Sequence, residues 1–219
     1  MNHYVGIVIS VILVMFSAIL HEVAHGWVAY RCGDNTAKDA GRLTLNPLAH
    51  IDPFGSVILP IIMGIAGGPI FAFAKPVPYN PYNLRNRRRD ELLVALAGPC
   101  ANLLQAIVGA ALFQAAFGWY SSSVSEVAYY VCYILSSYVY VNLVLMFFNL
   151  IPLPPLDGSS IIGVFLSGSA LEKYYQIQRY SLPILLIVLY LIPMVTSFDP
   201  LGIYLDVTAG NLYSLLLGA

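Results

Sequence analysis

Residues 4–30 read YVGIVISVILVMFSAILHEVAHGWVAY and indicate the class of fold. Its first part is an uninterrupted apolar run, and its last part carries His21, Glu22 and His25. A helix needs about 20 apolar residues to cross the hydrocarbon core of a bilayer. No basic region precedes the run, which is also long for a signal peptide. We therefore predict a retained membrane-spanning helix with three ionisable residues near its end.

The composition of the whole chain supports this assignment. Of its 219 residues, 59% are hydrophobic and 10% are charged, whereas soluble domains carry about 25% charged residues. Ten Lys and Arg against eleven Asp and Glu give a net charge of −1, so we predict no nucleic-acid partner. Cys32, Cys100 and Cys132 are too far apart for a Cys-x-x-Cys metal site or a disulfide framework. These numbers exclude a soluble globule, a disordered chain and a coiled coil, and they predict an integral membrane protein.

Further apolar stretches predict the other spans. Four stretches are clear candidates and two are ambiguous; the clear ones are residues 4–30, 92–119, 127–150 and 182–198, and the ambiguous ones are residues 54–74 and 201–217. The first ambiguous stretch is interrupted by helix-breaking residues, namely Pro60, Gly64, Gly67, Gly68 and Pro69. We expect it to be a membrane re-entrant segment, for which a β-hairpin is one form. The predicted fold class is an all-α polytopic membrane protein with four to five transmembrane helices plus this segment.

The basic residues predict the topology. All ten Lys and Arg lie either between the first and second clear spans or between the third and fourth. If residue 1 is outside, every one of them faces the cytoplasm, as the positive-inside rule prefers, provided that residues 54–74 do not cross. No polar run is long enough to form a separate soluble domain. We predict a single membrane domain over residues 1–219, with a core at 4–165 and C-terminal helices at 182–219.

The sequence His21-Glu22-Val23-Ala24-His25 matches His-Glu-x-x-His. Its i, i+4 spacing places both imidazoles on one helix face, where they can bind one zinc ion. Glu22 is not needed as a ligand, and its expected role is that of general base for a metal-bound water. Ionisable groups at this membrane depth cost several kcal/mol unless they are paired or used. A structural polar cluster that bridges helices is the alternative. Catalytic zinc takes three protein ligands, so a third ligand is needed.

Asp157 is the best candidate for that third ligand. His3 lies at the opposite end of the first helix, and His50 is expected to be an exposed turn residue. The sequence around Asp157 is Asn149-Leu-Ile-Pro-Leu-Pro-Pro-Leu-Asp-Gly158, in which three prolines forbid helix. The first and third spans both run inward, so Asp157 and the two histidines are expected at the same depth. A solvated Asp in an interfacial loop is the alternative.

Polar residues also occur within the second span. Gly98, Asn102, Gln105 and Gly109 share one helix face. This face is either a packing seam between helices or a place where Asn102 donates a hydrogen bond to substrate or to a developing oxyanion. Asn142 and Asn149 on the third span are expected to pack or to hold loops.

Taken together, four motifs resemble those of the site-2 protease family of intramembrane zinc metalloproteases, in its compact form without PDZ or CBS modules. They are His21–His25, Ala74–Pro81, Gly98–Asn102 and Asn149–Gly158, in the order in which the family has them. The resemblance implies one Zn²⁺ bound by His21, His25 and Asp157, with Glu22 activating water. It also implies that residues 54–74 meet the substrate and that Asn102 lies near the active site.

The resemblance further implies cleavage of a transmembrane segment of another membrane protein. The expected location is the cell membrane of a prokaryote, with the active site toward the cytoplasm. Three alternatives remain. A divalent metal transporter would need a polar path across the membrane, and a di-iron desaturase would need more than the four histidines present. The third is a non-catalytic binding protein of the same fold, against which Glu22 argues.

Overall fold

The computed structural model describes residues 3–52, 58, 74–123, 125–178, 180–196 and 198–218. They fall into two compact units, residues 1–101 and residues 102–219. All regular secondary structure in the described ranges is helical, which confirms the all-α class for them. Apart from Ile58 and Ala74, the predicted re-entrant segment lies outside the described residues.

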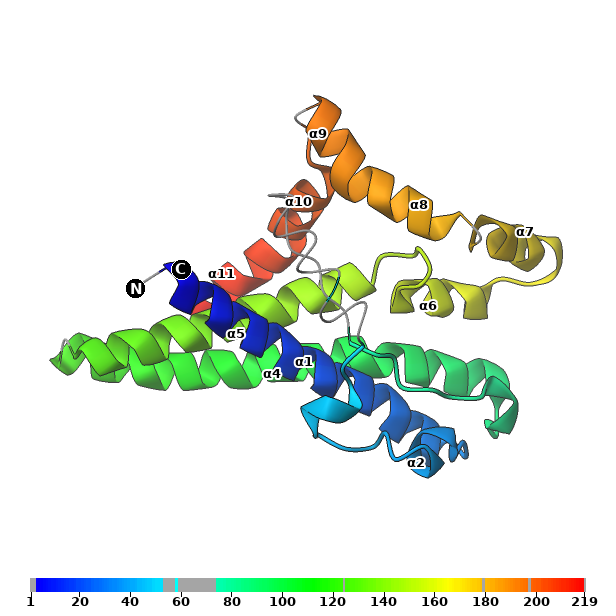
Figure 1. The fold of residues 1–219 in the computed structure, drawn as a ribbon, viewed down its shortest axis with the longest axis horizontal. Helices are drawn as coiled ribbons and strands as arrows, with labels where there is room; N and C mark the ends of the chain where they lie inside the picture. The colour runs from blue at the N-terminus through cyan, green and yellow to red at the C-terminus, as the bar shows by residue number, and fades with distance from the viewer. Residues whose placement is uncertain are drawn as a thin grey trace. The chain divides into compact units, whose positions relative to one another are not determined.

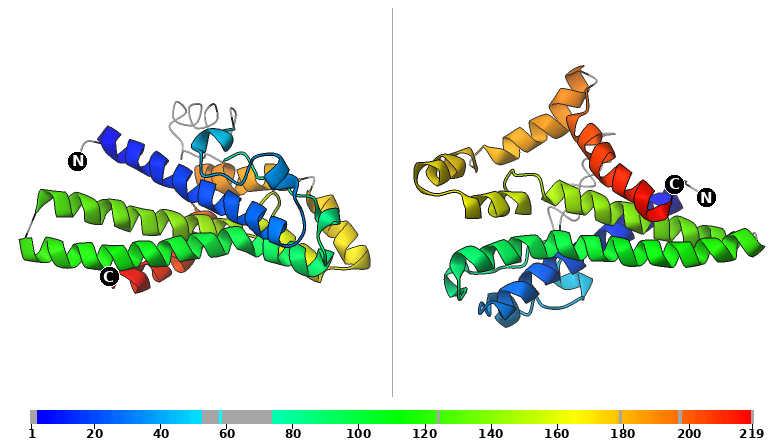
Figure 2. Two further views of the ribbon diagram at one scale, coloured as in Figure 1. Left: turned by 90° about the horizontal axis from the view of Figure 1, so that it is seen from below. Right: turned by 180° about the vertical axis from the view of Figure 1, so that it is seen from behind.

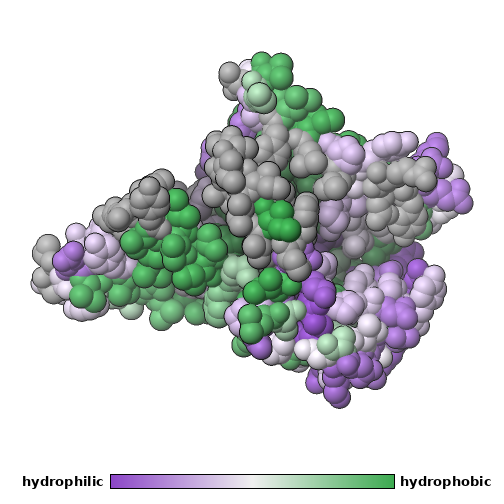
Figure 3. Space-filling view, in the orientation of Figure 1, coloured by the Kyte–Doolittle hydropathy of each residue, from purple (hydrophilic) through white to green (hydrophobic). Residues whose placement is uncertain are grey.

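Helix α1, His3–Arg31, dominates the first unit (Figure 1). Its first half exposes large apolar side chains such as Val8, Ile12 and Phe16, and the surface over it is hydrophobic in Figure 3. Its second half buries a stripe with a four-residue repeat: Ser17, His21, His25 and Ala29. Positions four apart stack on one face of an α-helix, so this polar stripe faces protein rather than lipid.

Short elements complete the first unit. Helix α2, Thr36–Asp39, folds beside the end of α1, and the surface over it is largely hydrophilic (Figures 1 and 3). The 3₁₀ turns η1, Pro47–Ala49, and η3, Pro81–Asn83, each begin with proline after an asparagine cap. Residues 74–80 between them are irregular, and the unit ends with the start of α4, Arg87–Ser123.

The second unit is built on a helical hairpin. The remainder of α4 and helix α5, Glu126–Asn149, lie side by side and antiparallel (Figure 2). Small residues of α4 pack against branched residues of α5, and the end of the chain joins the same core, which consists of Ala106, Ala110, Val139, Leu143, Ala209 and Leu217. Alanines allow the helix backbones to approach closely, as is common between membrane helices.

The rest of the second unit consists of shorter helices. A proline-rich loop leads from α5 to α6, Asp157–Phe165, which is followed by α7, Gly168–Gln178. The remaining elements are α8 (Ser181–Leu186), η4 (Ile187–Leu191), α9 (Ile192–Thr196), α10 (Pro200–Leu205), η5 (Asp206–Gly210) and α11 (Asn211–Leu217).

Three of the described helices are long and apolar enough to cross a membrane, namely Val5–Arg31, Arg87–Ser122 and Glu126–Asn149. The predicted fourth span is too short by itself. Together, Pro183–Thr196 and Pro200–Leu217 form a pair of helical segments with a bend of 112° between them. This pair counts as at most one further span. Pro200 begins a new helix, and the Asp199 carboxylate caps it by accepting from the Gly202 N–H at 2.8 Å. The predicted count of four to five spans is therefore not confirmed.

Candidate metal centre

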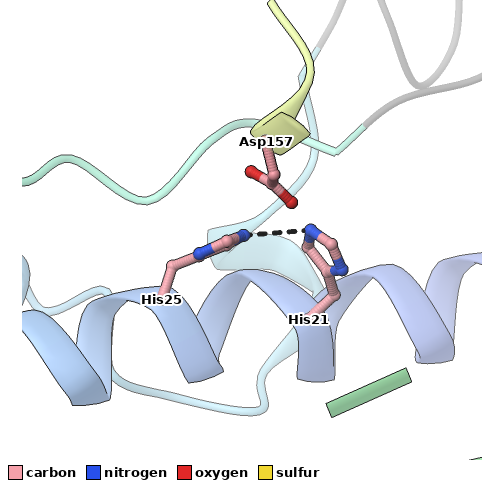
Figure 4. Close-up of side chains that lie close together, drawn as sticks. All are labelled: His21, His25 and Asp157. Atoms are coloured by element: carbon pink, nitrogen blue, oxygen red, sulfur yellow. Dashed lines mark hydrogen bonds between the residues drawn. The ribbon is translucent and has the colours of Figure 1, made fainter. Parts of the chain in front are cut away.

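Two imidazoles converge on the buried stripe of α1. His21 and His25 are 6% and 9% exposed, and their Nε2 atoms lie 3.0 Å apart (Figure 4). Their rings meet edge to face, with centroids 4.7 Å apart. The i, i+4 spacing of the sequence thus produces what it predicted, a pair of nitrogens directed at one point.

A backbone carbonyl defines the state of His25. Its Nδ1 donates to the Val94 carbonyl of α4 at 2.6 Å. A carbonyl can only accept, so Nδ1 carries a proton, and in the neutral ring Nε2 is then the nitrogen with the lone pair that a metal ion needs. Metal-binding histidines almost always donate their second N–H to such a group, which orients the ring and makes it a stronger ligand. The pair therefore has the chemistry of a divalent-metal ligand set.

Gly98 of α4 provides the space around this pair. A Cβ atom built on Gly98 would overlap the Nε2 atoms of both His21 and His25. Only glycine allows the α4 backbone to come this close to the point where the two nitrogens converge. The sequence indicates a small packing residue at Gly98, and nothing in the sequence connects it with the histidines.

The predicted general base is held by another part of the chain. The Glu22 carboxylate accepts a hydrogen bond from the Val77 N–H at 2.8 Å. Val77 is buried, and a Cβ on Gly26, one turn after Glu22, would meet its side chain. The motif at residues 74–81 was noted in the sequence without a role, and in the structure it contacts the turn of α1 that carries Glu22.

His50 differs from its prediction as an exposed turn residue, which is wrong. Its side chain is fully buried, and its Nε2 lies 2.8 Å from the Thr44 carbonyl. Its own carbonyl accepts from the Lys75 N–H at 2.8 Å. Local polarity suggested a solvated turn, but the side chain bonds to a carbonyl six residues earlier and the backbone to a residue more than 20 positions later.

Asp157 is the first residue of α6 and belongs to the second unit (drawn in Figure 4). The next residue, Gly158, is packed so tightly that a Cβ would overlap the carbonyl oxygens of Leu150 and Ile151. This close approach fixes where the proline-rich loop delivers Asp157 within its unit. Its role as third ligand stays a prediction.

Asn102 takes part in a buried polar seam between α4 and α5. Its Nδ2 donates to Asn142 Oδ1 at 2.9 Å, and Asn142 Nδ2 donates to the Tyr138 carbonyl at 3.0 Å. The Tyr138 hydroxyl in turn donates to Gln105 Oε1 at 2.7 Å. We call these four residues the amide seam. They join the two helices as a packing seam would, and a role of Asn102 toward substrate stays a prediction.

Comparisons with known proteins agree with this chemistry. A family model described as Peptidase family M50 matches residues 9–192. YwhC of Bacillus subtilis, named as a zinc metalloprotease, is 38% identical over 184 residues, which are 84% of this chain and 80% of that protein. Rip2 of Mycolicibacterium smegmatis, also named as a zinc metalloprotease, is 32% identical over 160 residues, 71% of this chain and 56% of that protein. No solved structure matches.

Proposed function

We propose, for a chain that belongs to peptidase family M50 and is a zinc metalloprotease of the membrane, a specific activity. It hydrolyses peptide bonds in or near transmembrane segments of other membrane proteins. Membership of this family does not favour the transporter or the non-catalytic alternative. Membrane-spanning α1 itself carries the two histidines. The proposed cleavage therefore takes place where a transmembrane substrate can reach the site from the bilayer.

We propose that His21, His25 and Asp157 bind the zinc ion. Each offers one ligand atom, an imidazole nitrogen or a carboxylate oxygen. Three protein ligands leave one position open, as catalytic zinc requires. The observation that carries the proposal is the converging pair of Nε2 atoms, with His25 oriented by the Val94 carbonyl.

Bound zinc would supply Lewis acidity, which polarises a peptide carbonyl and makes water acidic enough to be deprotonated near neutral pH. The remaining chemistry belongs to the chain. Glu22 would take the proton from the attacking water and later deliver it to the leaving amine. The Val77 N–H, 2.8 Å from Glu22 Oε2, would hold this carboxylate in place through both transfers. Asn102 would present its amide to the substrate, with its orientation set by Asn142.

We further propose that residues 1–219 act as one protease domain in the cell membrane of a prokaryote, with the active site toward the cytoplasm. The distribution of basic residues supports this orientation, because eight of the ten lie within residues 31–89, between the first two spans or at their facing ends. A helical substrate hides its carbonyls in hydrogen bonds, so a substrate segment must unwind locally before it can be cut.

The decisive experiment replaces the base and keeps the ligands. We expect Glu22→Gln to bind zinc at the wild-type level and to lose cleavage of a co-expressed transmembrane substrate. His21→Ala should lose both zinc and cleavage. Metal analysis of the purified proteins and gel analysis of the substrate give the two readouts. Cleavage by the Glu22→Gln variant at the wild-type rate would remove the proposed role of Glu22.

A further inference from the structure

Residues 74–80 contact the helix turn that carries Glu22 through a single backbone donor. Pro76 and Pro78 have no N–H, so Val77 is the one residue of this three-residue stretch that can donate. A slip of one residue in either direction would place a proline opposite Glu22 and would abolish the 2.8 Å hydrogen bond. The position of this segment along α1 therefore decides whether the carboxylate is held.

The start of the segment is fixed by the peptide groups of Lys75. Its N–H donates to the His50 carbonyl at 2.8 Å, and its carbonyl accepts from Nη2 of Arg42 at 2.7 Å. Arg42 is only 8% exposed. Burying a guanidinium is costly unless its hydrogen bonds are used. Its Nη2 makes a charge-assisted bond to a backbone carbonyl two residues from Val77, while its Nε has no hydrogen-bond partner among the described residues.

The end of the segment is fixed by Asp34, just beyond α1. Its fully buried carboxylate accepts from the Asn80 N–H at 2.7 Å and from Asn83 Nδ2 at 2.8 Å. The same carboxylate accepts from the Thr36 hydroxyl at 2.6 Å. Residues 75–80 are thus held at both ends, and the Val77 side chain is seated against Gly26 between them.

We infer that Arg42 is a positioning residue for Glu22. It acts through the Lys75 carbonyl, to which its Nη2 donates, and so keeps the Val77 N–H on the Glu22 carboxylate. This inference rests on the proposed function, in which Glu22 is the base. Its consequence is specific, because loss of Arg42 should slow the chemical step and leave zinc binding intact.

The test uses the full-length protein, purified with its zinc into lipid nanodiscs, and a transmembrane peptide that the wild type cleaves. We expect Arg42→Met to lower kcat by about 10- to 100-fold, part of the 10²–10⁴ that a positioned base contributes. KM should stay within about twofold and the zinc content should equal that of the wild type. Arg42→Lys should recover much of kcat, because an ammonium can donate to the same carbonyl.

Arg89→Met is the matched control, since it removes an exposed arginine from the same unit. It should change kcat by less than about twofold. Wild type and Glu22→Gln are measured beside it. If wild type fails to cut, or if Glu22→Gln cuts normally, the proposed function fails. If both behave as proposed, the Arg42 variants test the positioning role alone.

Three results would overturn the inference: an unchanged kcat in Arg42→Met, a loss of kcat that follows a loss of zinc, or an Arg42→Lys variant no better than Arg42→Met. If the Arg42 variants do not fold, a second pair decides. Val77→Pro removes the donor, whereas Val77→Ala keeps it and only trims the buried side chain. The proline variant must lose more kcat than the alanine variant at equal zinc content, and equal losses would refute the role of the N–H.

Discussion

Two regions of the molecule bury polar side chains within apolar helices, and they do so differently. In the amide seam, amide and hydroxyl donors of α4 and α5 meet oxygen acceptors, as in the bond from Asn102 to Asn142. On α1, by contrast, two groups of the same kind face each other, the Nε2 atoms of His21 and His25. The atoms of the seam are amide and hydroxyl groups that bind metal ions weakly, whereas the two hydrogen-bonded imidazole nitrogens are both potential metal ligands.

Buried polar groups that hold helices together can be distinguished from groups that bind a metal ion by the atoms they bring together. A seam in which amide and hydroxyl donors meet oxygen acceptors joins two helices, which is a structural task; in this seam only the Gln105 Nε2 is buried without a partner among the described residues. Two imidazoles with one orienting carbonyl behind them are suited to a shared positive ion. Burial alone does not separate the two cases, since Asn102 and Asn142 are even more buried than the histidines.

The substitution from which we expect the strongest change alters the surroundings of His21 and His25 and leaves the amide seam unchanged. Gly98→Ala places a methyl group where both Nε2 atoms converge. We expect it to lower zinc affinity by about 100-fold, at the upper end of what changes around a metal ligand cause. Zinc per chain, measured against competing chelators, provides the test. Gly118→Ala is the control in the same helix, because its Cβ would meet nothing within 4 Å. Equal affinity of the two variants would contradict the picture.

A smaller effect is expected from the seam. Asn142→Ala removes the acceptor of Asn102 and its own bond to the Tyr138 carbonyl. We expect a loss of about 0.5–2 kcal/mol in unfolding free energy, the range measured for such bonds in membrane proteins, with zinc content unchanged. Unfolding in mixed micelles measures the first and metal analysis the second. Ser136→Ala, which loses only a bond to a carbonyl of its own helix, serves as control. Loss of zinc in Asn142→Ala would erase the distinction between the two regions.

The sequence predicted the helices better than the contacts between them. Hydropathy placed the first and third spans within one or two residues of α1 and α5, because lipid-facing helices are apolar along their whole length. It began the second span at Leu92, whereas α4 begins at Arg87. The Asp90 carboxylate accepts from the Asn86 N–H at 2.8 Å and so extends the helix into polar sequence, which a hydropathy argument does not detect.

For the site, the i, i+4 spacing predicted the histidine pair, because helix geometry is local. The contacts of Glu22 with Val77 and of His25 with Val94 could not be predicted, since both use backbone groups more than 50 residues away. Backbone donors and acceptors exist at nearly every residue and leave no signature in the sequence. The prediction for His50 was wrong because both of its hydrogen bonds, from the side chain to the Thr44 carbonyl and from Lys75 to its own carbonyl, also use backbone groups.

Asp34, just beyond the end of α1, is a third buried polar group. Like the amide seam, it is matched by hydrogen-bond donors, but unlike the seam it carries a charge. Burial by itself would raise its pKa. Hydrogen bonds from Thr36, Asn83 and Asn80 outweigh that effect and hold the pKa below its ordinary value. The unfolded chain therefore binds a proton more readily than the folded one, so the contribution of Asp34 to stability is complete above the unfolded pKa of about 3.9 and is lost as pH falls below it.

We expect the thermal midpoint of the wild type to fall between pH 5 and pH 3, as the folded carboxylate is forced to accept a proton. Asp34→Asn should be less stable at pH 7 and should show a shallower decline over that interval. Asp39→Asn, which changes an exposed acid of the same unit, should keep the wild-type slope. The donors to Asp34 are neutral amides and a hydroxyl, so added salt should alter the effect little. Parallel curves for wild type and Asp34→Asn would show that the hydrogen bonds from Thr36, Asn80 and Asn83 do not stabilise the charged form of this carboxylate.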